Sequence, residues 1–112
     1  MKIEEFIDFC QSLGTDVKED MSREEAVKEN AQIFYVCDRM FAFYHGNDEQ
    51  VLTLMCQPER IAELKKQYDC IGKPYNPMSS TWMGINPYIA PDNLLKDLIR
   101  NSYELTKEKY GK

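Results

Sequence analysis

Several residue patterns on which enzymes and membrane proteins depend are missing from this 112-residue sequence. It has one histidine, His45, and no G-x-S-x-G elbow that could supply that histidine with a nucleophile. Its five glycines are scattered and form no phosphate-binding loop. No apolar run approaches the roughly 18–20 residues that a membrane helix needs. We therefore expect a protein that is not an enzyme and has no membrane span.

The cysteines also lack the spacing of a metal site, since no C-x-x-C pair occurs among the four of them. The first nine residues carry three acids and no long apolar stretch, unlike a signal peptide. We expect a cytoplasmic protein with reduced thiols that pack as small buried side chains. The four are Cys10, Cys37, Cys56 and Cys70.

The net charge of −5 is concentrated at one end of the chain. Residues 1–30 hold four basic and nine acidic side chains, whereas residues 31–112 hold ten of each. The isoelectric point of about 4.9 is opposite to that of most nucleic-acid-binding proteins. Glu4 and Asp8 stand one helical turn apart and could share a cation, but such faces are usually only solvated. We expect no metal and no cofactor.

Hydrophobic periodicity predicts helices over residues 2–13, 58–68 and 91–110. Aromatic and β-branched residues predict a hairpin of strands 32–37 and 40–45 around an Asp38-Arg39 turn, then strands at 51–56 and 81–86. Residues 71–80, with Gly72, Pro74 and Pro77, indicate an extended loop. Within residues 15–30, Ser22 and Glu25 match a capping box, the pattern that begins a helix. The segment is equally compatible with a short helix and with an ordered loop. The expected fold is a single α+β domain over 1–112, an antiparallel sheet with helices packed on it.

The hairpin strands are apolar on both faces. One face is expected to pack on helices, and the other to be partly covered or to form a contact surface. The aromatic residues concerned are Phe34, Tyr35, Phe41, Phe43 and Tyr44.

Three segments and a hairpin motif together resemble the YjbR/MmcQ family. They are MCQPERIAELKKQY at 55–68, GKPY with the following Met and Trp at 72–82, PDNLLKDLIRNSYEL at 91–105, and RMFAF at 39–43. The similarity covers roughly residues 32–110 and the position of the first helix. It implies a compact α+β fold like that of CyaY, the bacterial frataxin homologue. The family is often labelled DNA-binding-like, so the resemblance implies a DNA-binding protein of this type.

Two functions are therefore carried forward from the sequence. One is DNA binding, in which basic residues contact phosphates and Tyr75 and Trp82 stack on bases. The other is a protein- or small-ligand-binding module that uses the loop 75–82 and the aromatic hairpin, as a monomer or homodimer. A continuous positive stripe across 60–73 and 96–112 would favour DNA, and lysines interrupted by acids would favour the module. The candidate binding residues are Arg39, Lys73, Tyr75, Asn76, Ser79, Ser80 and Trp82.

Overall fold

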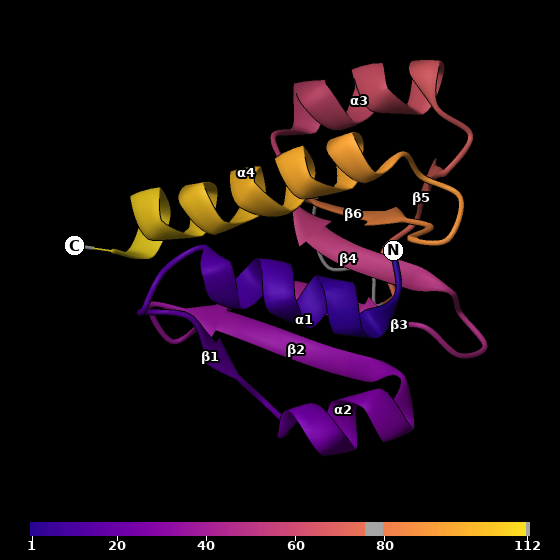
Figure 1. The fold of residues 1–112 in the computed structure, drawn as a ribbon. Helices are drawn as coiled ribbons and strands as arrows, with labels where there is room; N and C mark the ends of the chain where they lie inside the picture. The colour runs from indigo at the N-terminus through magenta and orange to yellow at the C-terminus, as the bar shows by residue number, and fades with distance from the viewer. Residues whose placement is uncertain (76–79, 112) are drawn as a thin grey trace.

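The computed structural model describes residues 1–75 and 80–111, which form helices packed against a single sheet (Figure 1). The helices are α1 (Ile3–Ser12), α2 (Arg23–Glu29), α3 (Pro58–Gln67) and α4 (Asp92–Tyr110). The strands are β1 (Lys18–Glu19), β2 (Ala31–Val36), β3 (Arg39–His45), β4 (Val51–Met55), β5 (Ile71–Gly72) and β6 (Trp82–Ile85). The strand order is β1-β2-β3-β4-β6-β5 and every pairing is antiparallel. The expected α+β fold class is confirmed.

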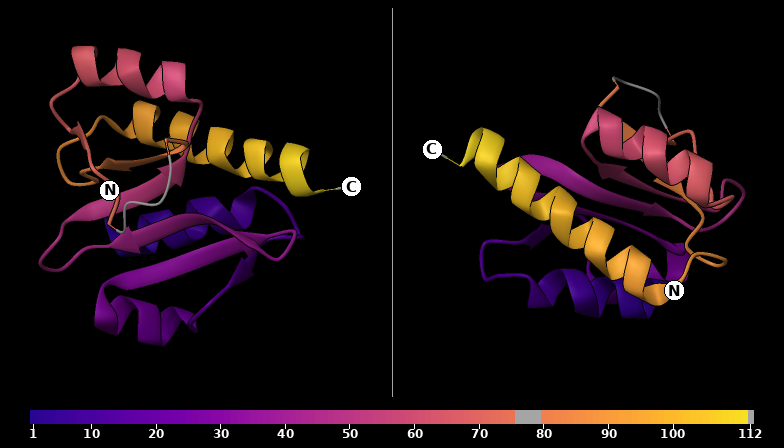
Figure 2. Two further views of the ribbon diagram at one scale, coloured as in Figure 1. Left: turned by 180° about the vertical axis from the view of Figure 1, so that it is seen from behind. Right: turned by 90° about the horizontal axis from the view of Figure 1, so that it is seen from above.

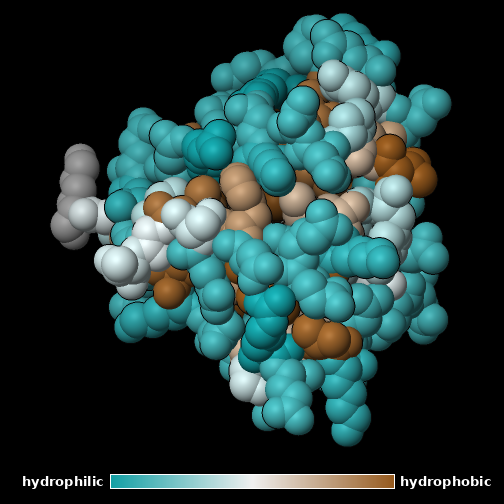
Figure 3. All heavy atoms as spheres, in the orientation of Figure 1, coloured by the Kyte–Doolittle hydropathy of each residue, from teal (hydrophilic) through white to brown (hydrophobic). Residues whose placement is uncertain are grey.

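The helices gather on one side of this sheet. α1 packs on β2, α4 crosses β3 and β4, α2 lies against α1, and α3 is joined to α4 by the Arg60–Asp97 ion pair. Their apolar stripes bury a core that includes Phe6, Phe34 and Leu98, each fully buried. Seen from behind, strands β2, β3 and β4 have no helix in front of them (Figure 2, left). The outer surface on the helix side is largely hydrophilic (Figure 3).

The hairpin has a different turn from the one expected. Cys37 and Asp38, with φ of 54° and 59°, are the two turn residues, and Arg39 already belongs to β3. Two consecutive left-handed residues are the signature of a primed turn, whose twist suits a two-residue hairpin. The Asp38-Arg39 turn was therefore wrong by one residue. The β2–β3 register also shifts at Phe41, which has no partner across the hairpin.

A buried serine of α4 compensates for this irregularity. The Ser102 hydroxyl donates to the carbonyl oxygen of Phe41 (2.5 Å) and accepts from the backbone N–H of Met55 (2.9 Å). Ser102 is fully buried, so one side chain satisfies backbone groups of β3 and β4 that have no access to water. This contact joins α4 to β3 and β4, beside the apolar stripe that packs on the sheet.

The two segments that the sequence left open or assigned to a loop contain short strands. Residues 15–30 form β1 and then α2, whose Ser22 cap accepts from the Glu25 backbone N–H (3.3 Å). The segment 71–80 was expected to be a loop throughout, but Ile71 and Gly72 pair with β6 as β5. Both strands are two residues long, and they are the two edge strands of the sheet.

Candidate binding face

The sheet face that carries no helix, here called the open face, presents a row of mainly apolar and aromatic side chains, most of which are half-buried. Residues paired across antiparallel strands point to the same side, so the register assigns them to one face. Tyr35 pairs with Met40, Phe43 pairs with both Ile33 and Thr53, and Met55 pairs with Trp82. Met55, at the end of β4, also reaches the Thr106 hydroxyl of α4. The other side chains on this face are Ile33, Tyr35, Met40, Phe43, His45, Thr53 and Trp82. The open face is thus apolar without being sealed from solvent.

The row includes the hydroxyl of Tyr35, a possible hydrogen-bond donor. Burial, with a smaller contribution from the charge of Asp20, raises the pKa of the Tyr35 hydroxyl above its ordinary value. A tyrosine is protonated at physiological pH even at its ordinary pKa, and this shift acts in the same direction.

The chain crosses part of the open face between β5 and β6. The Tyr75 backbone N–H donates to the Thr53 hydroxyl (2.9 Å), and the Tyr75 ring lies on His45 and Phe43, with centroids 4.4 and 5.1 Å apart. Gly84 makes the crossing possible, since a Cβ there would stand 2.0 Å from the carbonyl oxygen of Lys73. Within the described part of the chain, the buried Nδ1 of His45 has no hydrogen-bond partner. Tyr75 thus caps one end of the aromatic row and is itself 42% exposed.

A pocket of about 310 Å³, here called the Trp82 pocket, lies at the other end, where β3 and β6 begin and β4 ends. The Arg39 guanidinium stands 4.5 Å from the centroid of the Tyr110 ring, and the Lys109 ammonium stands 5.5 Å from it. This size is at the lower end of the range for small-molecule sites, so it suits one large side chain or a small ligand. Its described lining is Arg39, Met40, Met55, Thr81, Trp82, Lys109 and Tyr110.

A second pocket, of about 450 Å³, surrounds the crossing segment and is called the Tyr75 pocket. Lys73 and Glu49 place opposite charges on its wall, and Cys70 lies between β5 and α3. The two pockets therefore occupy opposite ends of β4 and β6, with the aromatic row between them.

The structure places four of the seven predicted binding residues in these two pockets. Arg39 and Trp82 share the Trp82 pocket, Lys73 and Tyr75 share the other, and Ser80 is exposed. The predicted residues Asn76 and Ser79 lie outside the described residues.

The sequence did not point to the rest of the Trp82 pocket. Met40, Met55, Lys109 and Tyr110 come from three elements that meet only in the folded chain. The one available signal was the aromatic residue next to a lysine at the end of the last helix, which is not a specific pattern.

Three of the basic residues that were candidates for phosphate contacts are paired with acids, and the described ion pairs do not include Lys65, Lys73, Lys96, Arg100 or Lys109. Arg60 contacts Asp97 (2.5 Å), Lys66 contacts Glu63 (4.0 Å), and Lys107 contacts Asp16 (2.9 Å). These pairs fall inside the two stretches in which a positive stripe was sought. The distribution corresponds to lysines and arginines interrupted by acids, the pattern that favours the non-nucleic-acid function.

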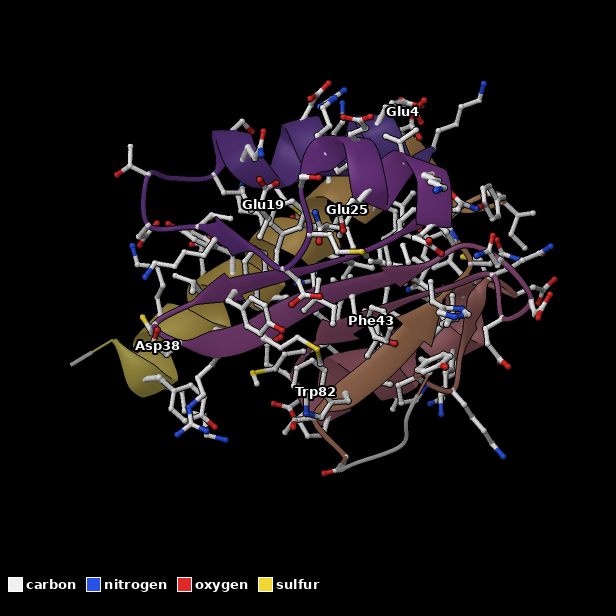
Figure 4. All side chains as sticks on the ribbon, turned by 90° about the horizontal axis from the view of Figure 1, so that it is seen from below. Glu4, Glu19, Glu25, Asp38, Phe43 and Trp82 are labelled. Atoms are coloured by element: carbon white, nitrogen blue, oxygen red, sulfur yellow. The ribbon has the colours of Figure 1, made fainter. Side chains whose placement is uncertain are left out.

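Most of the acidic segment lies away from Trp82, but Asp16 reaches the C-terminal half of α4, where it pairs with Lys107. β1 pairs with β2 at the opposite edge of the sheet from β6, and α2 packs on α1. Glu4, Glu19 and Glu25 are accordingly well separated from Trp82 (Figure 4). These distant acids therefore contribute little to the electrostatic potential at Trp82, which is set mainly by the charged residues nearest to it.

Three of the four thiols are in surroundings that disfavour the reactive thiolate. Burial raises the pKa of Cys10, Cys56 and Cys70 above the ordinary value, because desolvation disfavours the thiolate. Among the described residues no cluster of three or more His, Cys, Asp or Glu side chains could hold a metal ion. Nor is any described helix both long and apolar enough to cross a bilayer.

An antiparallel sheet covered by helices on one side and open on the other defines the class of this fold. The YjbR family model matches residues 15–105, and the chain belongs to that family. A solved structure of a Deinococcus radiodurans protein with a DUF419 domain superposes with a TM-score of 0.77 at 24% identity, over 96% of this chain and 80% of that one.

A second solved structure agrees with this fold. A Pseudomonas syringae protein superposes with a TM-score of 0.74 at 22% identity, over 95% of this chain and 99% of that one. At these identities the likeness concerns the fold alone. No curated protein matches the sequence.

Proposed function

We propose that this protein is a non-catalytic protein-binding module whose contact surface is the open face. The observation that carries the proposal is the row of mostly half-buried aromatic and aliphatic side chains on a sheet face that no described helix covers. Aromatic residues and methionine are enriched in the buried parts of protein interfaces, and the open face offers both. A partner would bury the row between the two pockets.

DNA binding, which the family resemblance implies, is the competing function. Tyr75 and Trp82 could stack on bases, and the acidic segment does not lie beside Trp82. Against it, phosphate binding depends on clustered cations that release counterions, and Arg60, Lys66 and Lys107 are paired with acids. The charge distribution therefore supports a protein partner over a nucleic acid.

The absence of catalysis is part of the same proposal. The Tyr75 ring covers His45, and the three thiols with raised pKa values remain protonated at neutral pH. Neither group is placed as an activated base or nucleophile. Recognition through apolar surface needs no such group.

One cross-linking experiment separates the two functions. The photoreactive residue benzoylphenylalanine is placed at Tyr35 on the open face, or at the exposed Glu63 on α3 as a matched control, and the cells that naturally make the protein are irradiated. The proposal predicts a discrete adduct at position 35 that protease removes and nuclease leaves intact, and no such adduct at position 63.

Other outcomes contradict the proposal. A nuclease-sensitive adduct at position 35 supports DNA binding instead, and binding of labelled single- or double-stranded DNA that weakens steeply with salt would agree with it. Identical adducts at both positions, or none at position 35, would show that the open face is not the contact surface.

A further inference from the structure

We infer that the Trp82 pocket selects an acidic segment of the protein partner, one in which an apolar side chain is flanked by carboxylates. This inference rests on the proposed function and names the chemistry of the partner. It follows from the charges that line the pocket, from its apolar floor and from its position at the end of the open face.

The charges of the Trp82 pocket are of one sign. Its described lining contains two charged residues, Arg39 and Lys109, and both are exposed cations. Elsewhere the described ion pairs join Arg23, Arg60, Lys66 and Lys107 to carboxylates. Arg39 and Lys109 are in none of these pairs. They contact the ring of Tyr110, as Lys96 and Arg100 contact that of Phe9, and this cation–π contact orients them without cancelling their charge.

The nearby acids do not alter this balance within the pocket. Asp38 precedes Arg39 and Glu108 precedes Lys109, but both are exposed and neither belongs to the described lining. Glu108 faces a neighbouring groove that it shares with Pro58 and Leu105. An anion in the Trp82 pocket would therefore meet the two cations first.

The apolar floor of the Trp82 pocket indicates that the partner segment also carries an apolar side chain. Met40, Met55 and Trp82 line the side facing the sheet, with Met55 almost completely buried and Trp82 half-buried. Methionine adapts to the shape of what it contacts, and an indole ring provides a rigid surface. A volume of about 310 Å³ accommodates one aromatic or large aliphatic side chain, leaving carboxylates to reach the rim.

The overall charge of the protein does not oppose an acidic partner at this position. Strand β1 of the acidic segment is separated from β6 by the width of β2, β3 and β4, and Asp16, which reaches α4, is already paired with Lys107. The Debye length at physiological ionic strength is about 8 Å, so charges at that edge are largely screened at the pocket.

The test uses two N-acetylated, C-terminally amidated pentapeptides that differ in charge, Gly-Glu-Phe-Glu-Gly and Gly-Gln-Phe-Gln-Gly. Because Trp82 is the sole tryptophan, its indole N–H gives one signal in a nitrogen–proton correlation spectrum. We expect the acidic peptide to shift that signal and to bind at least about fivefold more tightly than the amide peptide, as expected for two exposed charge contacts.

Charge variants then locate the effect. Replacing both cations of the pocket, Arg39→Gln with Lys109→Gln, should reduce the affinity for the acidic peptide to that for the amide peptide. The matched control replaces two exposed lysines of α3, Lys65→Gln with Lys66→Gln, and should leave the fivefold preference unchanged. All four positions are on the surface or at its edge, so the variants are expected to fold.

Three results would overturn the inference: equal affinity for the two peptides, an unshifted Trp82 signal at millimolar acidic peptide, or an equal loss in the α3 control. Equal affinity with shifts at Phe43 and Tyr35 would refute the acidic preference while leaving the open face as a protein-binding surface. Failure of the proposed function itself is seen separately, in the cross-linking result at position 35.

Discussion

Gly84→Ala tests the contact that positions Tyr75 on the open face. A Cβ at this position of β6 would lie 2.0 Å from the Lys73 carbonyl oxygen and 2.7 Å from its carbonyl carbon, both backbone atoms. Ordinary contact begins at 3.4 Å, so the crossing segment must retreat by roughly 1.4 Å. Gly72, its partner in the β5–β6 ladder, has no atom within 4 Å of the corresponding Cβ and provides the matched control.

The cost of Gly84→Ala has three parts. Inserting a methyl group into a filled space costs about 1–3 kcal/mol. Moving the segment also threatens the hydrogen bond from the Tyr75 N–H to the buried Thr53 hydroxyl, worth about 0.5–1.5 kcal/mol. Alanine also lowers the conformational entropy of the unfolded chain, which stabilises the folded state by about 0.4–1 kcal/mol. The free energy of unfolding should therefore fall by about 1–3 kcal/mol, whereas Gly72→Ala should be neutral or slightly stabilising.

Urea unfolding of both variants measures this difference. With a slope of about 1–3 kcal/mol per molar urea, the midpoint of Gly84→Ala should drop by roughly 1 M. Nuclear Overhauser contacts between the Tyr75 and His45 rings, whose centroids are 4.4 Å apart, should weaken in that variant alone. Coincident midpoints for the two variants, or an intact ring contact in Gly84→Ala, would refute this account of the crossing segment.

Three further substitutions test other parts of the structure. Ser102→Ala removes the hydroxyl that two buried backbone groups share, so the free energy of unfolding measured in urea should fall by about 2–4 kcal/mol. A loss as small as that of an ordinary surface substitution would contradict this role of Ser102. Hydrogen bonds from Tyr103 and then Lys107 hold the pKa of the Asp16 carboxyl below its ordinary value. Asp16→Asn should therefore lower the free energy of unfolding by about 0.2–1 kcal/mol at pH 7. Because a lowered pKa in the folded state stabilises only the ionised carboxylate, this loss should vanish as the pH falls below about 4. Equal losses at pH 7 and pH 2.5 would disprove this. His45→Phe keeps a ring under Tyr75 and removes the unpartnered Nδ1, so the melting temperature should rise by about 2–4 °C, and a fall would argue that the nitrogen has a role in the fold.

The elements of this protein could be predicted wherever a single chain segment contains the whole signal. The helical stripe of residues 91–110 matches α4, and Pro58 occupies the first turn of α3 as expected. The hairpin turn was misplaced because neither Asp38-Arg39 nor Cys37-Asp38 is a favoured pair, so composition gave no preference between registers one residue apart.

The candidate site could be predicted only in part, for the same reason. Arg39 and Trp82 were selected from the sequence as separate candidates, and the structure places them in one pocket. Lys109 and Tyr110 belong to that pocket only because α4 crosses β3 and β4, to which Ser102 joins it. A local sequence pattern does not predict how a helix crosses a sheet.

The sequence by itself determined the fold class, the family and the confinement of the acidic charge to residues 1–30, since each is a property of composition or of local order along the chain. The tertiary structure decided where most of that charge lies, at the sheet edge opposite Trp82, and which cations are paired. It also decided which face of the aromatic hairpin stays open. A strand that is apolar on both sides has no intrinsic preference for either, and only the side on which the helices pack makes one face the core and the other a surface for binding.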